Sequence, residues 1–234
     1  MIRDCREFCF VARRKRNLTL QQIVEAAASL LQRRGYDALT IRNVAELLGV
    51  KSASLYWHFK TKDDLEERLA DEMFADLIPA EPTDDWRMDL RNGSLRLRAH
   101  LLSKRDAGRI LAGRLGAGPN RLRQMEAGLG PFLRAGLDAR GAAFASHAVH
   151  VYVQGFVIFE TSPLAAAERK GKSRRRVLDD TRRTLAKLSK SAFPNITALA
   201  DALTIPDGEG RFLYGLDCLI AGIEQTAMKT RRSR

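Results

Sequence analysis

The sequence predicts an all-α protein built from a small N-terminal helical unit and a larger helical domain after it. Apolar residues recur at spacings of three and four along most of the chain, which is the period of amphipathic helices. No stretch shows a convincing alternation of apolar and polar residues, the pattern of half-buried strands. Pro79 and Pro82 interrupt the helical pattern and mark the boundary between the two parts.

The composition of the chain bears on its partners and its compartment. A formal net charge of +12 on 234 residues favours a polyanionic partner, DNA or RNA before a membrane surface. A soluble protein with a basic tail is the alternative. The cysteines (Cys5, Cys9 and Cys218) are few, odd in number and unsuited in spacing to zinc, so we expect a reduced, cytoplasmic protein. No run of about 20 apolar residues exists, so we expect no membrane span.

Residues 1–16 precede the first helical pattern and carry six Arg/Lys against two acidic residues. We expect a disordered, solvated tail. The same charges also suit an arm that contacts phosphates or a minor groove beside a main DNA site. A third interpretation places the start of the native protein at Val11, a few residues before the first helix.

The first helix is expected to begin at Thr19, because Thr19–Gln22 fits a capping box. Gly35 is expected to end it. The residues between form one apolar face: Leu20, Ile23, Ala27, Leu30 and Leu31. Such a face packs a helix against its neighbours.

Two short helices joined by a tight turn follow over residues 40–58. Thr40 is expected to cap the first of them, and Gly49 can take the positive φ that a helix stop requires. The inner face of that helix is Ile41, Val44, Ala45 and Leu48. The second helix, Lys51–His58, keeps Leu55 and Phe59 for the core and begins with small residues. Helix-turn-helix proteins read DNA bases with the first turn of such a helix.

A fourth helix is expected from Lys62 to about Ile78, with acidic residues in its first turn. From Asp84 the pattern stays helical, and a glycine-rich loop follows Ala112. The later helices are expected at Trp86–Lys104, Asp106–Ala112, Arg121–Arg140, Ala142–Glu160, Pro194–Leu203 and Arg211–Met228.

Two of these helices, Ala142–Glu160 and Arg211–Met228, carry more apolar surface than the core of one chain should need. This favours a homodimer through both helices, with intrachain burial as the alternative. Leu164–Lys190 has ten Lys/Arg against three acidic residues, and we expect a mobile surface loop leading into an exposed helix.

Several segments resemble the tetracycline-repressor (TetR) family. Ala45–Val50 and Leu55–Lys62 match its DNA-binding domain in residue types and spacing. Asp85–Asn92, Leu101–Asp106 and Arg211–Glu224 resemble its C-terminal domain.

The resemblance implies a division of the chain and a function. Residues 1–16 would be a basic tail, 17–79 a helix-turn-helix domain with its connecting helix, and 80–230 an effector-binding and dimerisation domain. The protein would be a homodimeric transcriptional repressor that binds a near-palindromic operator in double-stranded DNA and leaves it when a small-molecule effector binds. Two recognition helices about 34–36 Å apart would meet successive major grooves.

By the same resemblance, eight residues are expected at the DNA: Thr40, Arg42, Ser52, Ala53, Ser54, Tyr56, His58 and Lys62. Arg42 would bind guanine through two hydrogen bonds, and the residues from Ser52 to Ser54 would lie against base edges. The others would hold phosphates, Thr40 through its hydroxyl or its amide. The alternatives to these DNA contacts are that Arg42 is only a solvated surface charge and that Ala53 only favours helix formation. Trp57 is expected in the core.

The resemblance also bears on the effector. In tetracycline-binding members a histidine on the sixth helix holds the drug's magnesium, and an asparagine and a phenylalanine on the preceding helix contact the drug. The matching positions here are Leu111, Gly93 and Leu97, so we expect a different effector. Polar or aromatic residues on apolar helices are the pocket candidates, with ordinary core packing as the alternative for each: His100, Met125, Phe132, His147, His150 and Gln154.

Other functions find little support in the sequence. His147 and His150 lack a third ligand, so we expect no metal site, and we expect no cofactor. Neither a nucleophile–base pair nor a phosphate loop is visible, so we expect no enzyme. The remaining alternative is a basic helical protein that binds nucleic acid or anionic surfaces without sequence preference, through its tail and residues 164–190.

Overall fold

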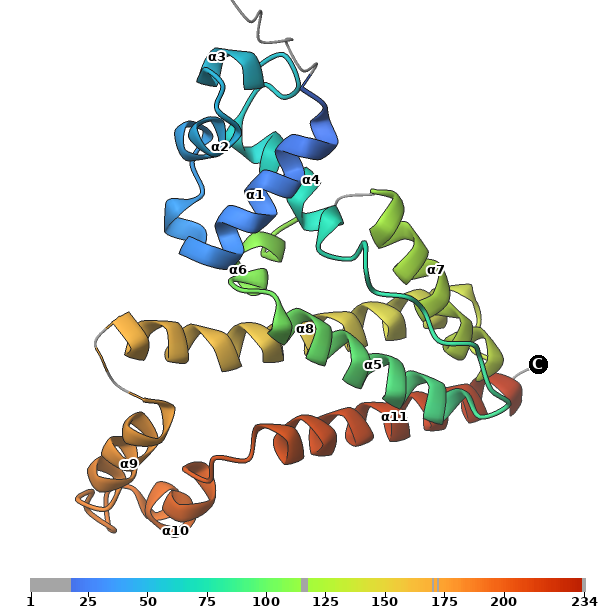
Figure 1. Cartoon of the computed structure of the whole chain (residues 1–234). Helices are drawn as coiled ribbons and strands as arrows, with labels where there is room; N and C mark the ends of the chain where they lie inside the picture. Colours follow the sequence, from blue (N-terminus) through green and yellow to red (C-terminus); the bar gives the residue numbers. More distant parts are fainter. Residues whose placement is uncertain (1–17, 115–117, 170, 172, 233–234) are drawn as a thin grey trace, which may run out of the picture.

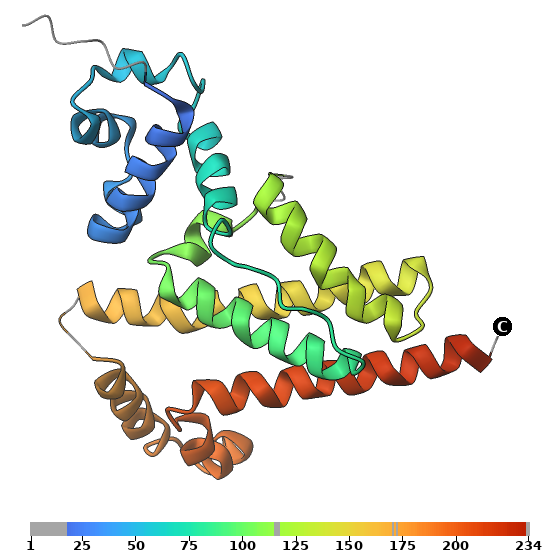
Figure 2. The ribbon, with the colours of Figure 1, turned by 45° about the vertical axis from the view of Figure 1, so that its right-hand side comes forward.

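The computed structural model describes residues 18–114, 118–169, 171 and 173–232, and these residues form helices without a strand. The predicted all-α class is confirmed. A compact head of α1–α4 lies at one end of the molecule, and longer helices form the core domain below it (Figure 1). Helices α9 and α10 form an arm on the side of the core away from the head, at the end of the core opposite the C-terminus (Figures 1 and 2). The predicted tail over residues 1–16 lies outside the described residues.

The first two helices of the head begin and end where the sequence predicts. In α1 (Leu20–Arg34), the Thr19 hydroxyl accepts from the amide of Gln22 at 3.2 Å, and the Gln22 side chain accepts from the amide of Thr19 at 3.1 Å. A short 3-10 helix, η1 (Tyr36–Ala38), leads to α2 (Ile41–Leu48). Gly49 ends α2 in the left-handed conformation, with φ 66°.

The next two helices are shorter than predicted. Helix α3 (Ser52–Leu55) has a single turn instead of two, and residues 56–58 form a turn. Helix α4 (Lys62–Glu72) ends before Met73, not near Ile78. The amides of Phe74 and Ala75 bond to carbonyls three residues back, which tightens the chain into turns after Glu72.

The core domain contains seven helices among the described residues: α5 (Trp86–Ser103), α6 (Ala107–Leu111), α7 (Pro119–Arg134), α8 (Ala139–Arg169), α9 (Arg174–Leu185), α10 (Pro194–Leu203) and α11 (Gly208–Arg232). Helix α7 ends before the predicted Arg140, because Gly136 takes φ 88° and turns the chain. Helix α8 runs past Glu160 to Arg169, so residues 164–169 are helical and not the predicted loop. Their run of alanines favours that extension.

Two hydrophobic clusters hold the chain together. The first fills the head and continues into α5, α6 and α8 through Leu101, Ile110 and Val157. The second joins α5, α7, α8 and α11 around Phe132 and Phe212. Because the first cluster spans the head and the core domain, a displacement of one must disturb the packing of the other.

A buried ion pair joins α5 to α8 inside the core domain. The guanidinium of Arg98 donates to both carboxylate oxygens of Glu160, at 3.0 and 2.9 Å. It also lies over the ring of Phe212 at 4.9 Å. Two hydrogen bonds and an aromatic face therefore fix this charge in place.

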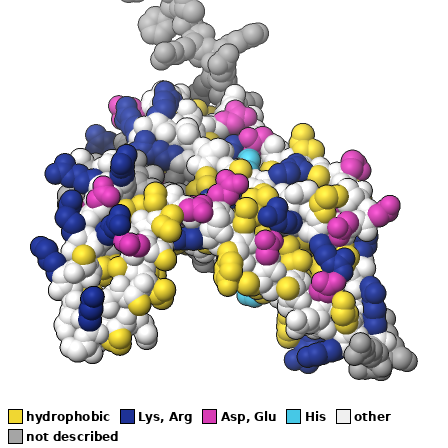
Figure 3. Space-filling model, turned by 90° about the horizontal axis from the view of Figure 1, so that it is seen from below, with side chains coloured by type: hydrophobic (Ala, Val, Ile, Leu, Met, Phe, Trp, Pro, Cys, Tyr) yellow, Lys and Arg dark blue, Asp and Glu magenta, His cyan; other side chains and the backbone are white. Residues whose placement is uncertain are grey.

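Helix α8 has a second apolar face, apart from the one in the hydrophobic clusters, that the described chain leaves exposed. Its stretch Ala139–Thr161 is long and apolar enough to cross a membrane by length and composition, yet only 22% of it is buried. Phe144 and Val151 are 62% and 51% exposed. Seen from below, hydrophobic side chains gather along the hollow between the two lobes of the molecule (Figure 3). A surface of this kind needs a partner.

Candidate nucleic-acid interface and effector site

The head presents the predicted DNA-contacting residues on the surface of α2, α3 and the turn after them, at the end of the molecule away from α9–α11 (Figure 1). Arg42 and Ala53 are exposed, and Ser52, Ser54 and His58 are partly exposed. The Tyr56 side chain is 52% exposed. Leu55 and Phe59 are buried as predicted and anchor this surface to the head.

Thr40 and Arg42 differ in which of their polar groups remain available to bind DNA. The amide of Thr40 donates to the carbonyl of Ala38 at 2.9 Å, so the hydroxyl is the better placed of the two groups predicted to hold a phosphate. The Thr40 hydroxyl accepts from the amide of Asn43 at 3.1 Å and keeps its own proton for a ligand. Arg42 has neither a hydrogen bond nor an ion pair with any residue that the structure describes, so its guanidinium is available.

Trp57 corrects a prediction. It was expected in the core but is 91% exposed, because the chain leaves the single turn of α3 at Leu55 and turns back to bury Phe59. Trp57 lies between these two anchors and points away from both. The residue spacing could have predicted this exposure, because a residue two positions from a buried helical residue lies on the opposite face of the helix.

Lys62 is not a free phosphate ligand. Its ammonium lies 3.0 Å from a carboxylate oxygen of Glu66 and 4.6 Å from the ring centre of Tyr36. At the start of α4, the amides of Thr61 and Lys60 donate to Asp64 and lower the pKa of its carboxyl group. Lys62 is therefore paired within the head, next to the carboxylate of Glu66 that Arg114 also contacts.

Charged and aromatic side chains connect the head to the core domain near α6. We call these residues the head–core junction: Tyr36, Asp37, Lys62, Asp63, Glu66, Asp106, Arg109 and Arg114. Tyr36 lies at its centre, between Lys62 and the guanidinium of Arg109, which is 4.2 Å from the ring centre. The Tyr36 hydroxyl donates to the buried carboxylate of Glu66 at 3.2 Å. Arg114 donates to the same carboxylate and to Asp63, the latter at 2.7 Å.

The N-terminus of α6 completes the head–core junction. Asp106 adopts a left-handed backbone with φ 56°, which Asp tolerates better than most residues, and accepts from the amide of Tyr36 at 2.8 Å. Arg109 pairs with Asp37 at 2.9 Å, and this contact raises the pKa of Arg109. Helix α6 is therefore tied to the segment between α1 and α2 by charged side chains.

The end of α4 is tied to α7 as well. Gly118 offers no side chain to cap α7, and Asp71 of α4 takes that role by accepting from the amide of Arg121 at 2.9 Å. It also accepts from the Asn120 side chain at 3.1 Å. A Cβ at Gly118 would lie 2.2 Å from Asp71, so only glycine fits there. Sequence reasoning missed this contact because the two residues are far apart in the chain.

The six predicted effector residues lie in different surroundings. Met125, His147 and His150 are exposed, and Phe132 is 2% exposed in the second hydrophobic cluster. His100 donates through Nε2 to the carbonyl of Met73 at 2.6 Å, which satisfies the end of α4. Gln154 is partly buried on α8.

Comparisons with known proteins settle the family. Residues 23–69 match the family model of bacterial regulatory proteins, tetR family, and residues 78–227 match that of the tetracyclin repressor-like C-terminal domain. The chain belongs to the TetR family. It is 32% identical over 221 residues to the class C tetracycline repressor protein of Escherichia coli, covering 91% of this chain and 94% of that protein.

Solved structures of TetR-family proteins share this fold. The Streptomyces coelicolor protein ActR in complex with actinorhodin superposes with a TM-score of 0.80 at 29% identity, covering 90% of this chain and 98% of that one. TetR from Acinetobacter baumannii AYE gives a TM-score of 0.62 at 30% identity, with 90% and 98% covered. The chain therefore has the all-α architecture of this family, head and core domain together.

The structure shows the surroundings of Leu111, the residue that the resemblance matches to the magnesium-holding histidine of tetracycline binders. Leu111 is 3% exposed in the first hydrophobic cluster. An aliphatic side chain cannot coordinate a metal ion. Across the described part of the chain, no group of three or more His, Cys, Asp or Glu residues lies close enough to hold one.

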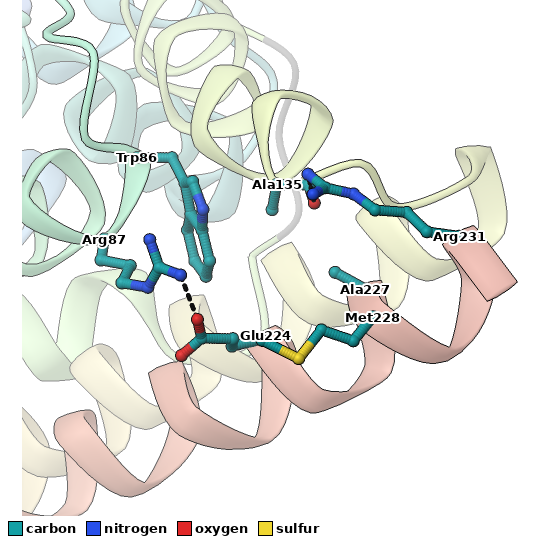
Figure 4. Close-up of a pocket in the computed structure, with 7 residues that line it drawn as sticks. All are labelled: Trp86, Arg87, Ala135, Glu224, Ala227, Met228 and Arg231. Carbon is teal, nitrogen blue, oxygen red and sulfur yellow. Dashed lines mark hydrogen bonds and ion pairs between the residues drawn. The ribbon is translucent and has the colours of Figure 1, made fainter.

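Two small cavities are described, and neither contains a predicted effector residue. One, of about 200 Å³, lies between the ends of α5, α7 and α11 with Trp86 as a wall (Figure 4). There Arg87 pairs with Glu224 and lowers the pKa of its carboxyl group. The other, of about 260 Å³, lies between α1, α4 and the end of α5. The Arg87–Glu224 pair joins α5 to α11. The first cavity therefore lies at a packing contact between these helices.

Trp57 is expected to report DNA binding by this TetR-family chain. The sequence contains two tryptophans, so Trp57 is the only tryptophan left to fluoresce in a Trp86→Phe variant. Addition of a duplex that carries the operator should quench its fluorescence and shift it to the blue, because the exposed ring becomes covered. A scrambled duplex at the same salt is the control. Unchanged emission at saturating operator would place Trp57 outside the interface.

Proposed function

We propose that the protein is a homodimeric transcriptional repressor that binds a near-palindromic operator and leaves it when a small organic effector binds. Residues 17–79 would form the DNA-binding domain, and residues 80–230 would bind the effector and the second subunit. The proposal rests above all on one observation: the surface of α2 and α3 presents polar and aromatic side chains that the rest of the chain does not use.

The DNA-contacting residues divide into two roles. Arg42 has no partner among the described residues and suits bidentate binding to guanine, while Ser52, Ala53 and Ser54 are small enough to let α3 approach base edges. Tyr56, His58 and the Thr40 hydroxyl suit phosphate oxygens. To these we add Trp57, whose exposed ring can pack on the sugar–phosphate backbone. We leave out Lys62, whose charge is paired within the head–core junction.

The second subunit is expected on α8 and α11. Exposed residues recur along one side of α11 at helical spacing: Tyr214, Cys218, Ala221, Gln225 and Met228. Phe144 and Val151 of α8 are exposed as well, and α8 and α11 contact each other, which supports one partly apolar face built from both helices. A two-fold axis through this face would form a four-helix interface and set the distance between the two heads.

An Arg42→Ala substitution is expected to weaken operator binding about tenfold to a hundredfold, since a bidentate base contact contributes about 1–3 kcal/mol. Footprinting or gel shifts at moderate salt with a scrambled competitor would measure it, with the operator taken first from the DNA beside the gene. Arg34→Ala is the matched control, because Arg34 is an exposed arginine of the same head at the core-facing end of α1.

The same experiment tests the second candidate function, a basic protein without sequence preference. Residues 174–176 of α9 and Arg42 would then contribute similarly, and affinity would collapse with salt for every duplex alike. Equal binding to operator and scrambled DNA, with equal effects of Arg42→Ala and Arg34→Ala, would reject the repressor proposal.

A further inference from the structure

The larger of the two described cavities, about 260 Å³, lies where the head meets the core domain, between α1, α4 and the end of α5. The C-terminal ends of α1 and α4 point toward the core domain (Figure 1). We call this space the α1–α4–α5 cavity. Part of its lining is apolar, because Leu31, Leu69 and Met73 are buried there. Sites for drug-sized ligands have about 300–1,000 Å³, so this cavity suits a more compact molecule.

Four charged side chains complete the lining of the α1–α4–α5 cavity: Glu72, Asp76, Lys104 and Arg105. Three of them have a partner of opposite charge. Lys104 lies 2.7 Å from Asp76, and this contact lowers the pKa of the Asp76 carboxyl group. Arg105 lies 4.0 Å from Asp106. Glu72 makes no ion pair with any residue that the structure describes, so its negative charge is the one that the lining leaves uncompensated.

The hydrogen bonding of Glu72 is weak as well. Its carboxylate accepts from the side-chain amide nitrogen of Gln21 at 3.5 Å, and the same nitrogen donates to Glu25 at 3.2 Å. Two carboxylates thus share one neutral donor, and within the described part of the chain neither of them faces a cation. The local field is therefore negative and favours a positively charged ligand.

The position of Glu72 on α4 strengthens this field. Glu72 is the last residue of α4, and the last turn of that helix contains no basic residue. The C-terminus of a helix carries about half a negative elementary charge, so an acidic side chain is unfavourable there and a cation is favourable. The acids at the other end of α4, Asp63 and Asp64, stabilise the helix, whereas Glu72 does not. A bound cation would compensate both the carboxylate and the end of the helix.

We propose that the α1–α4–α5 cavity binds a compact organic cation, whose ammonium group pairs with Glu72 and whose apolar body packs on Leu31, Leu69 and Met73. This site is separate from the DNA-contacting surface, and it does not depend on the proposed function, because it concerns a ligand of the chain alone. Helix α1 belongs to the head and α5 to the core domain. A ligand between them therefore favours the arrangement of head and core that the structure shows.

Three matched probes test the proposal on the full chain. Phenethylammonium carries the cation, 2-phenylethanol has a neutral hydroxyl on the same ring and linker, and 3-phenylpropanoate has an anion there. In isothermal titration calorimetry at neutral pH, the wild type should bind phenethylammonium about tenfold more tightly than the other two, the effect of one charge-assisted hydrogen bond. Glu72→Gln should remove that preference and leave the affinity for 2-phenylethanol unchanged. Glu46→Gln is the matched control, because Glu46 is exposed on α2, which does not line the cavity.

A cavity-filling variant locates the binding. Ala28 of α1 lines the cavity and is partly buried, so Ala28→Leu should weaken the binding of phenethylammonium and of 2-phenylethanol alike. Neither this variant nor Glu72→Gln should lower the melting temperature, since leucine is a good helix former and glutamine removes an acid from the negative end of α4.

Several results would overturn the proposal. One is a wild-type chain that does not bind phenethylammonium at millimolar concentration, and another is a wild-type chain that binds 3-phenylpropanoate more tightly. Equal phenethylammonium affinities of Glu72→Gln and Glu46→Gln would exclude Glu72 as the counter-ion. Undiminished binding to Ala28→Leu would place the probes outside the cavity.

Discussion

Replacing Arg114 with methionine is expected to lower the free energy of unfolding by about 3–5 kcal/mol, the usual effect of removing one partner from a buried ion pair. Glu66 is 3% exposed, and Arg114 is its charged hydrogen-bond partner from the core domain. Lys62 and the Tyr36 hydroxyl remain beside the carboxylate, so we expect the lower end of that range. Urea denaturation followed by circular dichroism would measure the loss.

A surface charge in the same network provides the control. Asp63 also pairs with Arg114, but its side chain is 81% exposed, so Asp63→Asn should cost less than about 1 kcal/mol. The double variant Glu66→Gln with Arg114→Met should recover much of the loss, because it leaves no uncompensated buried charge. Equal stabilities of Arg114→Met and Asp63→Asn would show that Glu66 does not depend on Arg114.

This ion pair bears on function because of where it lies. Glu66 belongs to α4, which continues from the DNA-binding head, while Arg114 follows α6 in the core domain. The nearby Asp71 bonds to α7, and His100 of α5 bonds to the end of α4. Helix α4 is thus held along its length by three elements of the core domain. A change in any of them can reach the head through discrete polar contacts, which suits a two-state switch.

The parts of the fold that were predictable from the sequence are those determined by residues close to one another along the chain. The capping box at Thr19, the cap at Thr40 and the left-handed Gly49 each involve residues within a few positions of one another. The apolar stripe of α1 follows from helical periodicity in the same way, and its residues are buried or partly buried. Signals of this kind need no knowledge of tertiary contacts.

Two residues differ from their predicted surroundings for reasons that residue type does not show. Lys62 looked like a phosphate ligand because its position matches the family pattern, but Glu66 and Tyr36 engage its ammonium. Trp57 looked like a core residue because it is large and apolar, but the single turn of α3 leaves it outside. Residue type alone could not decide either case.

The predicted effector residues show how little residue type says about a position inside a helical domain. Phe132 and Gln154 are both exceptions on apolar helices, yet Phe132 is a core residue, while Nε2 of Gln154 is buried without a hydrogen-bond partner among the described residues. Burial and hydrogen-bond partners separate the two, and both are properties of the folded chain.

A charge in the middle of the exposed face of α8 is expected to break the dimer. Val151 is 51% exposed near the centre of the apolar stretch, and Val151→Glu would place two like charges close to the two-fold axis. Sedimentation at micromolar concentration should show a monomer. Operator affinity should fall about a hundredfold to ten-thousandfold, because the two half-sites would no longer be bound together.

Met125→Glu is the matched control for this effect. Met125 is 60% exposed on α7, so Met125→Glu adds the same charge at a similarly exposed apolar position on a helix outside the proposed interface. Neither variant should lose helicity, because neither side chain belongs to a hydrophobic cluster of the chain. If Val151→Glu stayed dimeric with full operator affinity, the second subunit would have to lie elsewhere. The uncovered face of α8 would then need a different partner, since an apolar surface of that length is costly to leave in water.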